Sequence, residues 1–523
     1  MFFRNFIFLI FIFVIGCNQR PAGVDFIFVN GDEPQSLDPA IISGQLDMRM
    51  AKALFEGLYT YGPDASIKPG IATHHDLSED GLTYTFYLRS DATWSNGDKV
   101  TAYDFEKSWR RVLEPTTASK YSEIMYFIHN AEAYNKGELF DFKKVGIEAL
   151  NELTFQVTLH SPAAYFQGLT AFATYLPVHL STIKKYGDAW IKPEHMVSNG
   201  PYLLEDWRIK DRIRLKKNPN YWNAESVKFN RIDALATSSA STAFNLYETG
   251  QVDLILDKTM IPGMLMGELS EREDMHSYIY LGTYFFRMNM TRPFLQDSKV
   301  RKALALSVDK EKIVNKITRG GEQPARTFCT PGINKYQPPE GLGFDPEAAS
   351  KLMSEAGYPN GEGFPRISIL YNKSELNQQI AVELQAMWKE HLNIDIDLRL
   401  QEWATYLRSM DNLDYDIARS SWIGDYVDPN TFLDCFVTGR GNNRTGWSNP
   451  RYDALLEQAN LNLDPVQRAE LLKDAERILV EEDMPIIPVY HVAGKLLYRK
   501  NKLGGIQPNV LAEHPLQYLY WKE

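Results

Sequence analysis

One segment in the C-terminal part of the chain has the most specific sequence, and it reads Asp416-Ile417-Ala418-Arg419-Ser420-Ser421-Trp422-Ile423-Gly424-Asp425-Tyr426-Val427-Asp428-Pro429. The residues around Ile417 alternate in the way that suits a β-strand, and Gly424 breaks this alternation. The break places Trp422 and Asp425 at the end of the strand and on the loop after it. An aspartate there has two interpretations: it caps a turn or helix, or its carboxylate binds a ligand.

The first residues of the chain predict export. Arg4 precedes an apolar run at residues 6–15, which Gly16 and Cys17 follow. Such a run has the length of a secretory signal and is too short for a permanent membrane span. The Gly-Cys ending resembles a bacterial lipobox, so we predict a signal peptide at residues 1–16, lipidation of Cys17 and a tether at residues 17–23. The protein would then be anchored by lipid to the cell membrane, on its periplasmic or extracellular face. A plain signal or an uncleaved anchor is the alternative.

Composition narrows the class of protein. The 523-residue chain is 44% hydrophobic and 24% charged, which is ordinary for a globular protein with a large core. Its length predicts about two to four domains. The formal net charge of −11 argues against nucleic acid as a partner. Cys329 and Cys435 are the only cysteines besides Cys17; whether they pair is open, and their spacing indicates no metal site.

The apolar pattern predicts strands and helices in alternation. We expect strands at residues 24–30, 83–88, 153–159, 202–207, 212–216 and 394–400, and helices at residues 47–58, 298–317, 346–356, 376–391 and 465–481. The helix at 376–391 followed by the strand at 394–400 indicates an α/β unit. No internal repeat or low-complexity linker occurs. We therefore expect lobes that are joined by crossing strands.

Signals of catalysis are weak. Residues 181–184 and 307–310 both fit Ser-x-x-Lys, but no Lys-Thr-Gly or Lys-Ser-Gly companion occurs. A nucleophile elbow, a zinc-protease motif and a phosphate loop are also absent from the sequence. A glycosidase carboxylate pair stays open, because its members need not be close along the chain. We predict a protein that is not an enzyme and has no cofactor.

Several segments, taken together, resemble the peptide-binding lipoproteins of ATP-driven oligopeptide importers, which are large extracytoplasmic solute-binding proteins. The resemblance runs from about residue 30 to the C-terminus. Besides residues 416–429, it rests on residues 31–39, 54–58, 94–98, 101–105, 114–119, 199–202, 214–222, 300–304 and 401–403.

The resemblance implies an α/β, periplasmic-binding-protein-like fold with two lobes and an extra third domain, the cluster C type. The expected domains are lobe I at residues 24–46, 180–281 and 493–523, extra domain II at residues 47–179, and lobe II at residues 282–492.

The function that the resemblance implies is the binding of extended oligopeptides in a closed cleft between the lobes, by a monomer that delivers them to the transmembrane subunits of an ABC permease. The alternatives are a receptor for another ligand (a dipeptide, a murein peptide, haem or a nickel chelate), a surface sensor or adhesin, and an anchored hydrolase.

The resemblance also implies site residues. In the family, the aspartate at the position of Asp425 pairs with the α-ammonium of the ligand. Trp422 and Trp403 would form pocket walls, and Arg419 would bind the ligand carboxylate or balance a charge near Asp425. The full set of expected ligand-binding residues is Asp425, Trp422, Ser421, Ile423, Arg419, Glu33, Pro34, Tyr121, Trp403 and His491.

For most of these residues a structural role is the alternative. Trp403, Trp422, Tyr121 and His491 could pack in the core, and Arg419 could form a surface or structural ion pair. Glu33 and Pro34 are expected at the cleft mouth, where only the carbonyl of Pro34 could bind the ligand backbone, because proline has no N–H.

The chain also departs from its enteric relatives. Two cysteines of those proteins correspond here to Gly282 and Ile423, so their disulfide is lost. Two cleft histidines correspond to Phe172 and Asn377. These changes leave open how the carboxylate of a ligand is recognised and which peptide length is preferred.

Overall fold

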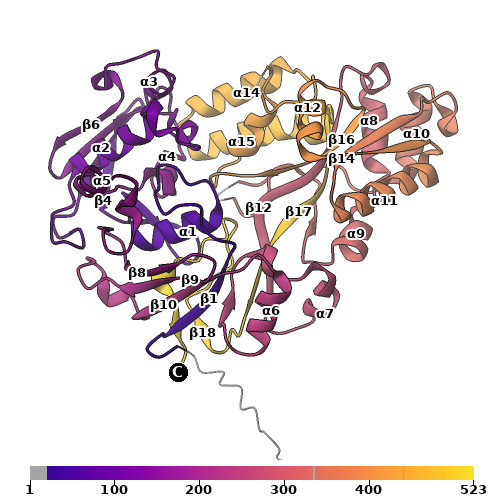
Figure 1. Cartoon of the computed structure of the whole chain (residues 1–523). Helices are drawn as coiled ribbons and strands as arrows, with labels where there is room; N and C mark the ends of the chain where they lie inside the picture. Colours follow the sequence, from indigo (N-terminus) through magenta and orange to yellow (C-terminus); the bar gives the residue numbers. More distant parts are fainter. Residues whose placement is uncertain (1–20, 334–335, 440) are drawn as a thin grey trace, which may run out of the picture.

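The computed structural model describes residues 21–333, 336–439 and 441–523, and Figure 1 shows their arrangement. The predicted signal peptide at residues 1–16 and the predicted lipidation site Cys17 lie outside the described residues. Within these ranges, none of the helices combines the length and the apolar character that a bilayer span needs.

An eleven-stranded mixed sheet forms the frame of the molecule. Its order is β15-β14-β16-β12-β17-β11-β1-β10-β9-β8, and β13 pairs with β17 beside this path. The strands are β1 (Phe26–Gly31), β8 (Tyr202–Arg208), β9 (Arg212–Lys217), β10 (Arg231–Ala236), β11 (Leu254–Ile255), β12 (Met275–Met288), β13 (Gln323–Pro324), β14 (Ile367–Asn372), β15 (Ile396–Gln401), β16 (Ile417–Ile423) and β17 (Ile486–Tyr498). The pairs of β1 with β10 and β11, and of β14 with β15 and β16, are parallel. The sheet and its helices confirm the predicted α/β class.

Two long strands join the halves of this sheet. We call the part built on β11-β1-β10-β9-β8 lobe I and the part built on β15-β14-β16 lobe II. β12 and β17 pair antiparallel with each other between them, and their register shifts between Ile279 and Thr283 (Figure 1). β12 continues into lobe II by pairing with β16, and β17 continues into lobe I by pairing with β11. The expected crossing strands are therefore present, whereas the domain boundaries stay a prediction.

A second, four-stranded sheet forms the part that we call domain II. Its order is β4-β5-β7-β6, with β4 (Ala72–Leu77), β5 (Thr83–Leu88), β6 (Ile147–Asn151) and β7 (Thr154–Thr158). The helix α2 (Ala102–Leu113) contributes the fully buried Trp109, whose ring meets Phe155 of β7 and Tyr175 edge-on. Smaller pairs are β2 (Tyr59–Tyr61) with β3 (Ile67–Pro69) and β18 (Leu503–Gly504) with β19 (Tyr520–Trp521).

The helices surround these sheets, and several match the sequence predictions closely. The longer ones are α1 (Gln45–Leu54), α6 (Ala240–Glu248), α8 (Ser298–Leu306), α10 (Pro346–Glu355), α11 (Glu375–Leu392), α12 (Trp403–Asp411), α14 (Pro450–Leu461) and α15 (Pro465–Arg477). Short ones are α3 (Ala131–Asn135), α4 (Phe166–Leu169), α5 (Leu180–Tyr186), α7 (Met266–Leu269), α9 (Lys310–Ile313) and α13 (Asn430–Leu433). Strand β5 has the predicted bounds, and α10 and α11 lie within one residue of theirs.

Three predicted helices are shorter in the structure. The one expected at residues 465–481 ends as an α-helix at Arg477 and continues as a π-turn at Ile478–Glu482. The helix expected at residues 298–317 is divided into α8, α9 and a π-turn at Val314–Thr318, because the side chain of Asp309 caps a new helix by accepting a hydrogen bond from the backbone N–H of Lys312 at 2.9 Å. The helix expected at residues 47–58 ends at Leu54. There the backbone of Glu56 bonds instead with the side-chain amide of Asn199, which both donates and accepts at 3.0 Å.

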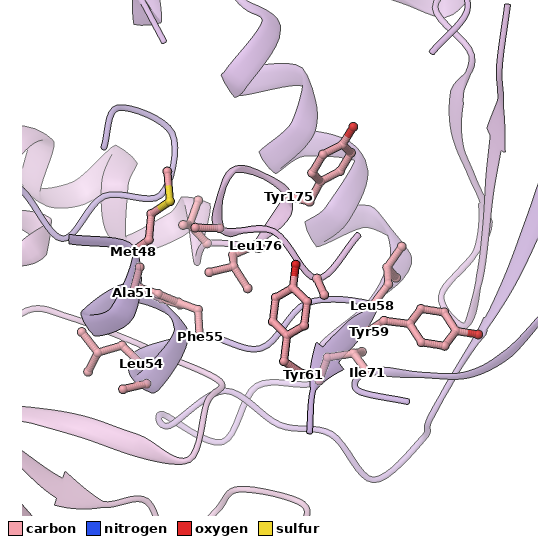
Figure 2. Close-up of a cluster of buried hydrophobic side chains, with 14 of the residues drawn as sticks. Met48, Ala51, Leu54, Phe55, Leu58, Tyr59, Tyr61, Ile71, Tyr175 and Leu176 are labelled. Atoms are coloured by element: carbon pink, nitrogen blue, oxygen red, sulfur yellow. The ribbon is translucent and has the colours of Figure 1, made fainter. Parts of the chain in front are cut away.

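Three of the motifs that carry the family resemblance meet at this point. The buried carboxylate of Glu56 accepts hydrogen bonds from the Tyr221 hydroxyl and from Trp222 Nε1. Gly200 approaches the backbone of Leu54 so closely that an added Cβ would lie 2.6 Å from it. Apolar side chains of α1 and of the segment after it continue this contact into the core of domain II (Figure 2). These motifs are therefore structural, since they join α1 to the strands of lobe I.

Candidate ligand-binding site

A cavity of about 400 Å³ lies where lobe I, domain II and the end of β16 meet. Its walls come from α1, from the short turn Lys258–Met260, from β12, from the loop after β16 and from residues 511–513. The lining residues that bear charges or rings are Arg49, Lys52, Tyr61, Tyr121, Phe172, Lys258, Tyr280, Asp425 and Glu513.

Local structure places Asp425 at this cavity. β16 pairs with β12 up to Ile423, and the chain then turns at Gly424, whose N–H donates to the Leu281 carbonyl at 2.8 Å. An added Cβ at Gly424 would lie 2.8 Å from side-chain atoms of both Leu281 and Thr431, so a larger residue would push the loop away from β12. The backbone N–H of Asp425 donates to Thr431 Oγ1 at 3.1 Å, which holds the loop where Asp425 lines the cavity. The predicted strand and its break at Gly424 are confirmed.

The carboxylate of Asp425 has no hydrogen-bond or ion-pair partner among the described residues, although it is half-buried. Burial raises the pKa of Asp425, and no nearby cation opposes this effect. The carboxylate also contributes to the raised pKa of Tyr121 and of Tyr280, for both of which burial is the larger cause. A half-buried carboxylate without a partner is costly, so the geometry favours a cationic group of a ligand here.

The cavity also holds three cationic side chains. Arg49 Nη1 donates to the carbonyl and the Oδ1 of Asn30, at 3.0 and 2.6 Å, and Lys52 forms an ion pair with Glu513. Lys258 lies over the ring of Tyr280, with Nζ 4.1 Å from the ring centroid. Burial, with a contribution from Lys495, lowers the pKa of Lys258 to about 8.

Among the predicted site residues, Asp425, Tyr121 and Ile423 line this cavity together. Trp422 points to the other side of the loop, where it lines a second cavity of about 470 Å³ that also touches Asp425. Its Nε1 donates to the Thr431 carbonyl at 2.7 Å, which holds the indole against the loop. Trp422 is thus at once part of a cavity wall and a structural support.

Arg419 and Ser421 lie two residues apart on β16, so their side chains share one face of the strand. Arg419 donates to Asn372 Oδ1 at 3.2 Å and to Ser421 Oγ at 3.3 Å, and its guanidinium lies 4.7 Å from the centre of the Tyr284 ring. Asn377, which replaces a histidine of enteric relatives, accepts from the Tyr284 hydroxyl at 3.1 Å. Within the described ranges, no carboxylate forms an ion pair with Arg419, so its charge is still available to an anionic group.

The remaining predicted site residues do not line the Asp425 cavity. Glu33 accepts from Trp207 Nε1 at 2.7 Å and from the Lys210 N–H at 2.6 Å, and Pro34 beside it is buried. Trp403 is 55% exposed and stacks on Tyr406 at the start of α12. His491 is buried in β17, where its ring lies 3.0 Å from Thr283 Oγ1, and burial lowers its pKa to about 3.

Several lining residues escaped the sequence analysis. Gln45, Arg49 and Lys52 form a polar stripe on α1 at spacings of four and three residues, opposite its buried apolar face. This stripe was visible in the sequence as the polar side of an amphipathic helix. Lys258 and Tyr280 carry no comparable local signal, because they belong to different elements that only the fold brings together.

The cysteines and the Ser-x-x-Lys motifs also have clear positions. Cys329 and Cys435 are both buried and unpaired, so the open question of their pairing is answered. Ser307 and Lys310 are buried, with their side chains bonded to the carbonyls of Leu304 and Leu342. No cluster of three metal-ligating side chains occurs within the ranges that the structure describes.

Comparison with known proteins agrees with this architecture. Residues 66–444 match the family model of bacterial extracellular solute-binding proteins, family 5 Middle. The oligopeptide-binding protein OppA of Bacillus subtilis (strain 168) is 34% identical over 489 residues, which are 91% of this chain and 89% of that protein.

Solved structures extend the comparison to the lobes. The periplasmic oligopeptide-binding protein OppAIV of Borrelia burgdorferi is 35% identical with a TM-score of 0.75, over 95% of this chain and 99% of that chain. The unliganded open form of the murein tripeptide binding protein MppA is 30% identical with a TM-score of 0.86, over 95% and 97%. The TM-score is therefore higher for the second structure, although its sequence identity is lower.

Proposed function

The chain belongs to family 5 of the bacterial extracellular solute-binding proteins, and we propose that it binds extended oligopeptides at Asp425 for delivery to an ABC-type permease. Relatives that cover most of the chain are named as binding proteins for oligopeptides, dipeptides and murein peptides. The anchor for this task would be the lipidated Cys17. The protein would act as a monomer that binds its ligand without changing it.

The observation that carries this proposal is the unpartnered carboxylate of Asp425 in the cavity wall. The α-ammonium of a peptide would supply the missing charge. Such an ion pair becomes stronger when a closing cleft removes water, since the effective dielectric constant falls. Arg419, which has no carboxylate partner in the described structure, would be available to the other end of a short peptide.

The edge of β16 supports binding of the peptide main chain. β14 pairs with β16 only at Ile417 and Ala418, so no strand of the described chain pairs with residues 419–423 on that side. An extended peptide could therefore add to this edge by backbone hydrogen bonds, with its amino terminus at Asp425. In this mode the affinity comes from hydrogen bonds to the peptide main chain, so the site selects only weakly among peptide side chains.

The two crossing strands support closure around the ligand. β12 and β17 connect the strands of lobe I with those of lobe II in the described sheet, and their pairing is irregular between Ile279 and Thr283. A hinge at that irregularity would bring Asp425 and β16 toward lobe I and enclose the peptide. The closed shape would then be the form that the permease recognises.

The first test is native mass spectrometry of the purified mature protein, before and after mild denaturation. A ladder of short co-purified peptides is expected. A single non-peptide mass would keep the fold and overturn the proposed ligand.

The second test addresses the amine site by isothermal titration with one peptide in its free and N-acetylated forms. Asp425→Asn should weaken binding of the free peptide roughly 10- to 100-fold, the range for a hydrogen bond to a charged group. Acetylation should weaken binding to the wild-type protein by a similar factor and to the variant hardly at all. The exposed Asp188→Asn serves as the matched control. Equal affinities of the wild-type protein and Asp425→Asn would refute this placement.

A further inference from the structure

We propose that Lys258 recognises an anionic side chain near the amino terminus of the ligand, so that the site prefers peptides with Asp or Glu as their first or second residue. This inference rests on the proposed function, because it takes the α-ammonium to bind at Asp425. It adds to that function a preference for one class of peptide and names the residue that determines it.

The fold directs Lys258 into the cavity. Lys258 begins the short turn Lys258–Met260, which follows β11. The preceding Asp257 uses its Oδ1 to accept from the backbone N–H and the hydroxyl of Thr259, at 2.8 and 2.7 Å. The nearest carboxylate along the chain is thus held by its own turn, and no carboxylate of the described residues forms an ion pair with the ammonium of Lys258.

Lys258 differs in this respect from the other two cations of the cavity. The guanidinium of Arg49 donates twice to Asn30, and the ammonium of Lys52 is engaged by Glu513. Within the part of the chain that the structure describes, the ammonium of Lys258 has no hydrogen bond or ion pair and lies 4.1 Å from the centre of the Tyr280 ring. The carboxylates of Asp257 and Glu322 act on it only from a distance, and Glu322 is paired with Lys495. A cation on a ring face is stabilised but still lacks hydrogen-bond acceptors, so an anionic ligand group would complete its environment.

The two unpartnered charges, Lys258 and Asp425, line the same cavity of about 400 Å³ together with Tyr280, whose ring lies under Lys258. Burial is the largest cause of the raised pKa of Tyr280, and the carboxylates of Glu513 and Asp425 add to it. The hydroxyl of Tyr280 accepts from Gln45 Nε2 of α1, which anchors the ring at the wall of this cavity. A ligand that satisfies both must carry an ammonium and an anion within a short distance. An extended peptide advances about 3.3–3.6 Å per residue, so an acidic side chain on the first or second residue fits.

The test compares matched peptides that differ only in charge. Wild-type protein is titrated calorimetrically with Glu-Ala-Ala-Ala-Ala and Gln-Ala-Ala-Ala-Ala, and with Ala-Glu-Ala-Ala-Ala and Ala-Gln-Ala-Ala-Ala. We expect the glutamate peptide of at least one pair to bind roughly tenfold more tightly. Equal affinities within both pairs would overturn the inference.

Variants then assign the preference to Lys258. Lys258→Met keeps the apolar stem over Tyr280 but removes the charge, and it should reduce the ratio of glutamate to glutamine affinities to about one. Lys258→Arg should retain the ratio, as should the control Lys351→Met on the exposed side of α10. A ratio that survives in Lys258→Met would refute the role of this residue.

Failure of the proposed function gives a different pattern. If no peptide binds, or if the glutamine peptides bind equally well to Asp425→Asn, the amine site itself is wrong, whatever Lys258 does. If free glutamate binds as tightly as the pentapeptides, the two charges hold a single amino acid, and both the peptide preference and the oligopeptide ligand are overturned.

Discussion

The buried carboxyl group of Glu476 predicts a pH-dependent stability that one substitution removes. Glu476 lies on the inner face of α15 and is fully buried. Its Oε1 accepts from the backbone N–H groups of Phe328 and Cys329, at 2.8 and 2.7 Å, and its Oε2 accepts from the Tyr336 hydroxyl. It therefore attaches Phe328, Cys329 and Tyr336 to the core of lobe II.

Burial raises the pKa of Glu476 from 4.5 to about 7, although the three donors oppose this effect. Between these two pH values the folded protein holds a proton that the unfolded chain has released. The free energy of unfolding therefore decreases as pH rises. The stabilisation that protonated Glu476 contributes is fully present below pH 4.5 and is lost as the pH rises through 7. A pKa shift of this size changes the free energy of unfolding by at most about 3 kcal/mol.

The perturbation is Glu476→Gln, which keeps the shape and an acceptor for the two N–H groups but cannot ionise. Urea unfolding is measured for both proteins between pH 4.5 and 8. The stability of the variant relative to wild type should increase by about 2–3 kcal/mol over this range. Glu470→Gln, on the exposed face of the same helix, should show no such trend. Parallel stability curves for wild type and Glu476→Gln would show that Glu476 does not cause this pH dependence.

Two further predictions concern how the lobes and domain II are held. Gly282 and Ile423 are register partners in the antiparallel pair of β12 and β16, so the double variant Gly282→Cys and Ile423→Cys should form a disulfide on oxidation. The intact mass would then decrease by two hydrogens, and the disulfide would raise the free energy of unfolding by up to about 5 kcal/mol for a loop of this length. Thiols that stay reduced would contradict this geometry. Tyr426 after β16 stacks on Tyr165 of domain II with ring centroids 4.4 Å apart, so a double-mutant cycle with alanine at both positions should give a coupling of about 1 kcal/mol in the free energy of unfolding. Strictly additive effects would show that this contact does not hold the loop to domain II.

Elements with a local cause could be predicted from the sequence. The alternation up to Ile423 and the break at Gly424 place β16 and its loop correctly, because strand pattern and glycine act within a few residues. The predicted end of a helix was wrong where a residue distant in the sequence forms hydrogen bonds with the backbone. α1 ends early because Asn199, far along the chain, bonds to the backbone of Glu56.

The charges that meet in the cavity come from distant parts of the chain. The local pattern of residues 416–429 is enough to place Asp425 after a strand end, and the family resemblance indicated an amine site there. The sequence could not place Lys258 and Tyr280 beside Asp425, because they lie on the turn after β11 and on β12, more than a hundred residues earlier. Nor could it show that β12 and β17 cross between the lobes, since strand pairing over such separations depends on the whole fold. Local pattern therefore determined the carboxylate's position, and the assembled sheet determined its surroundings.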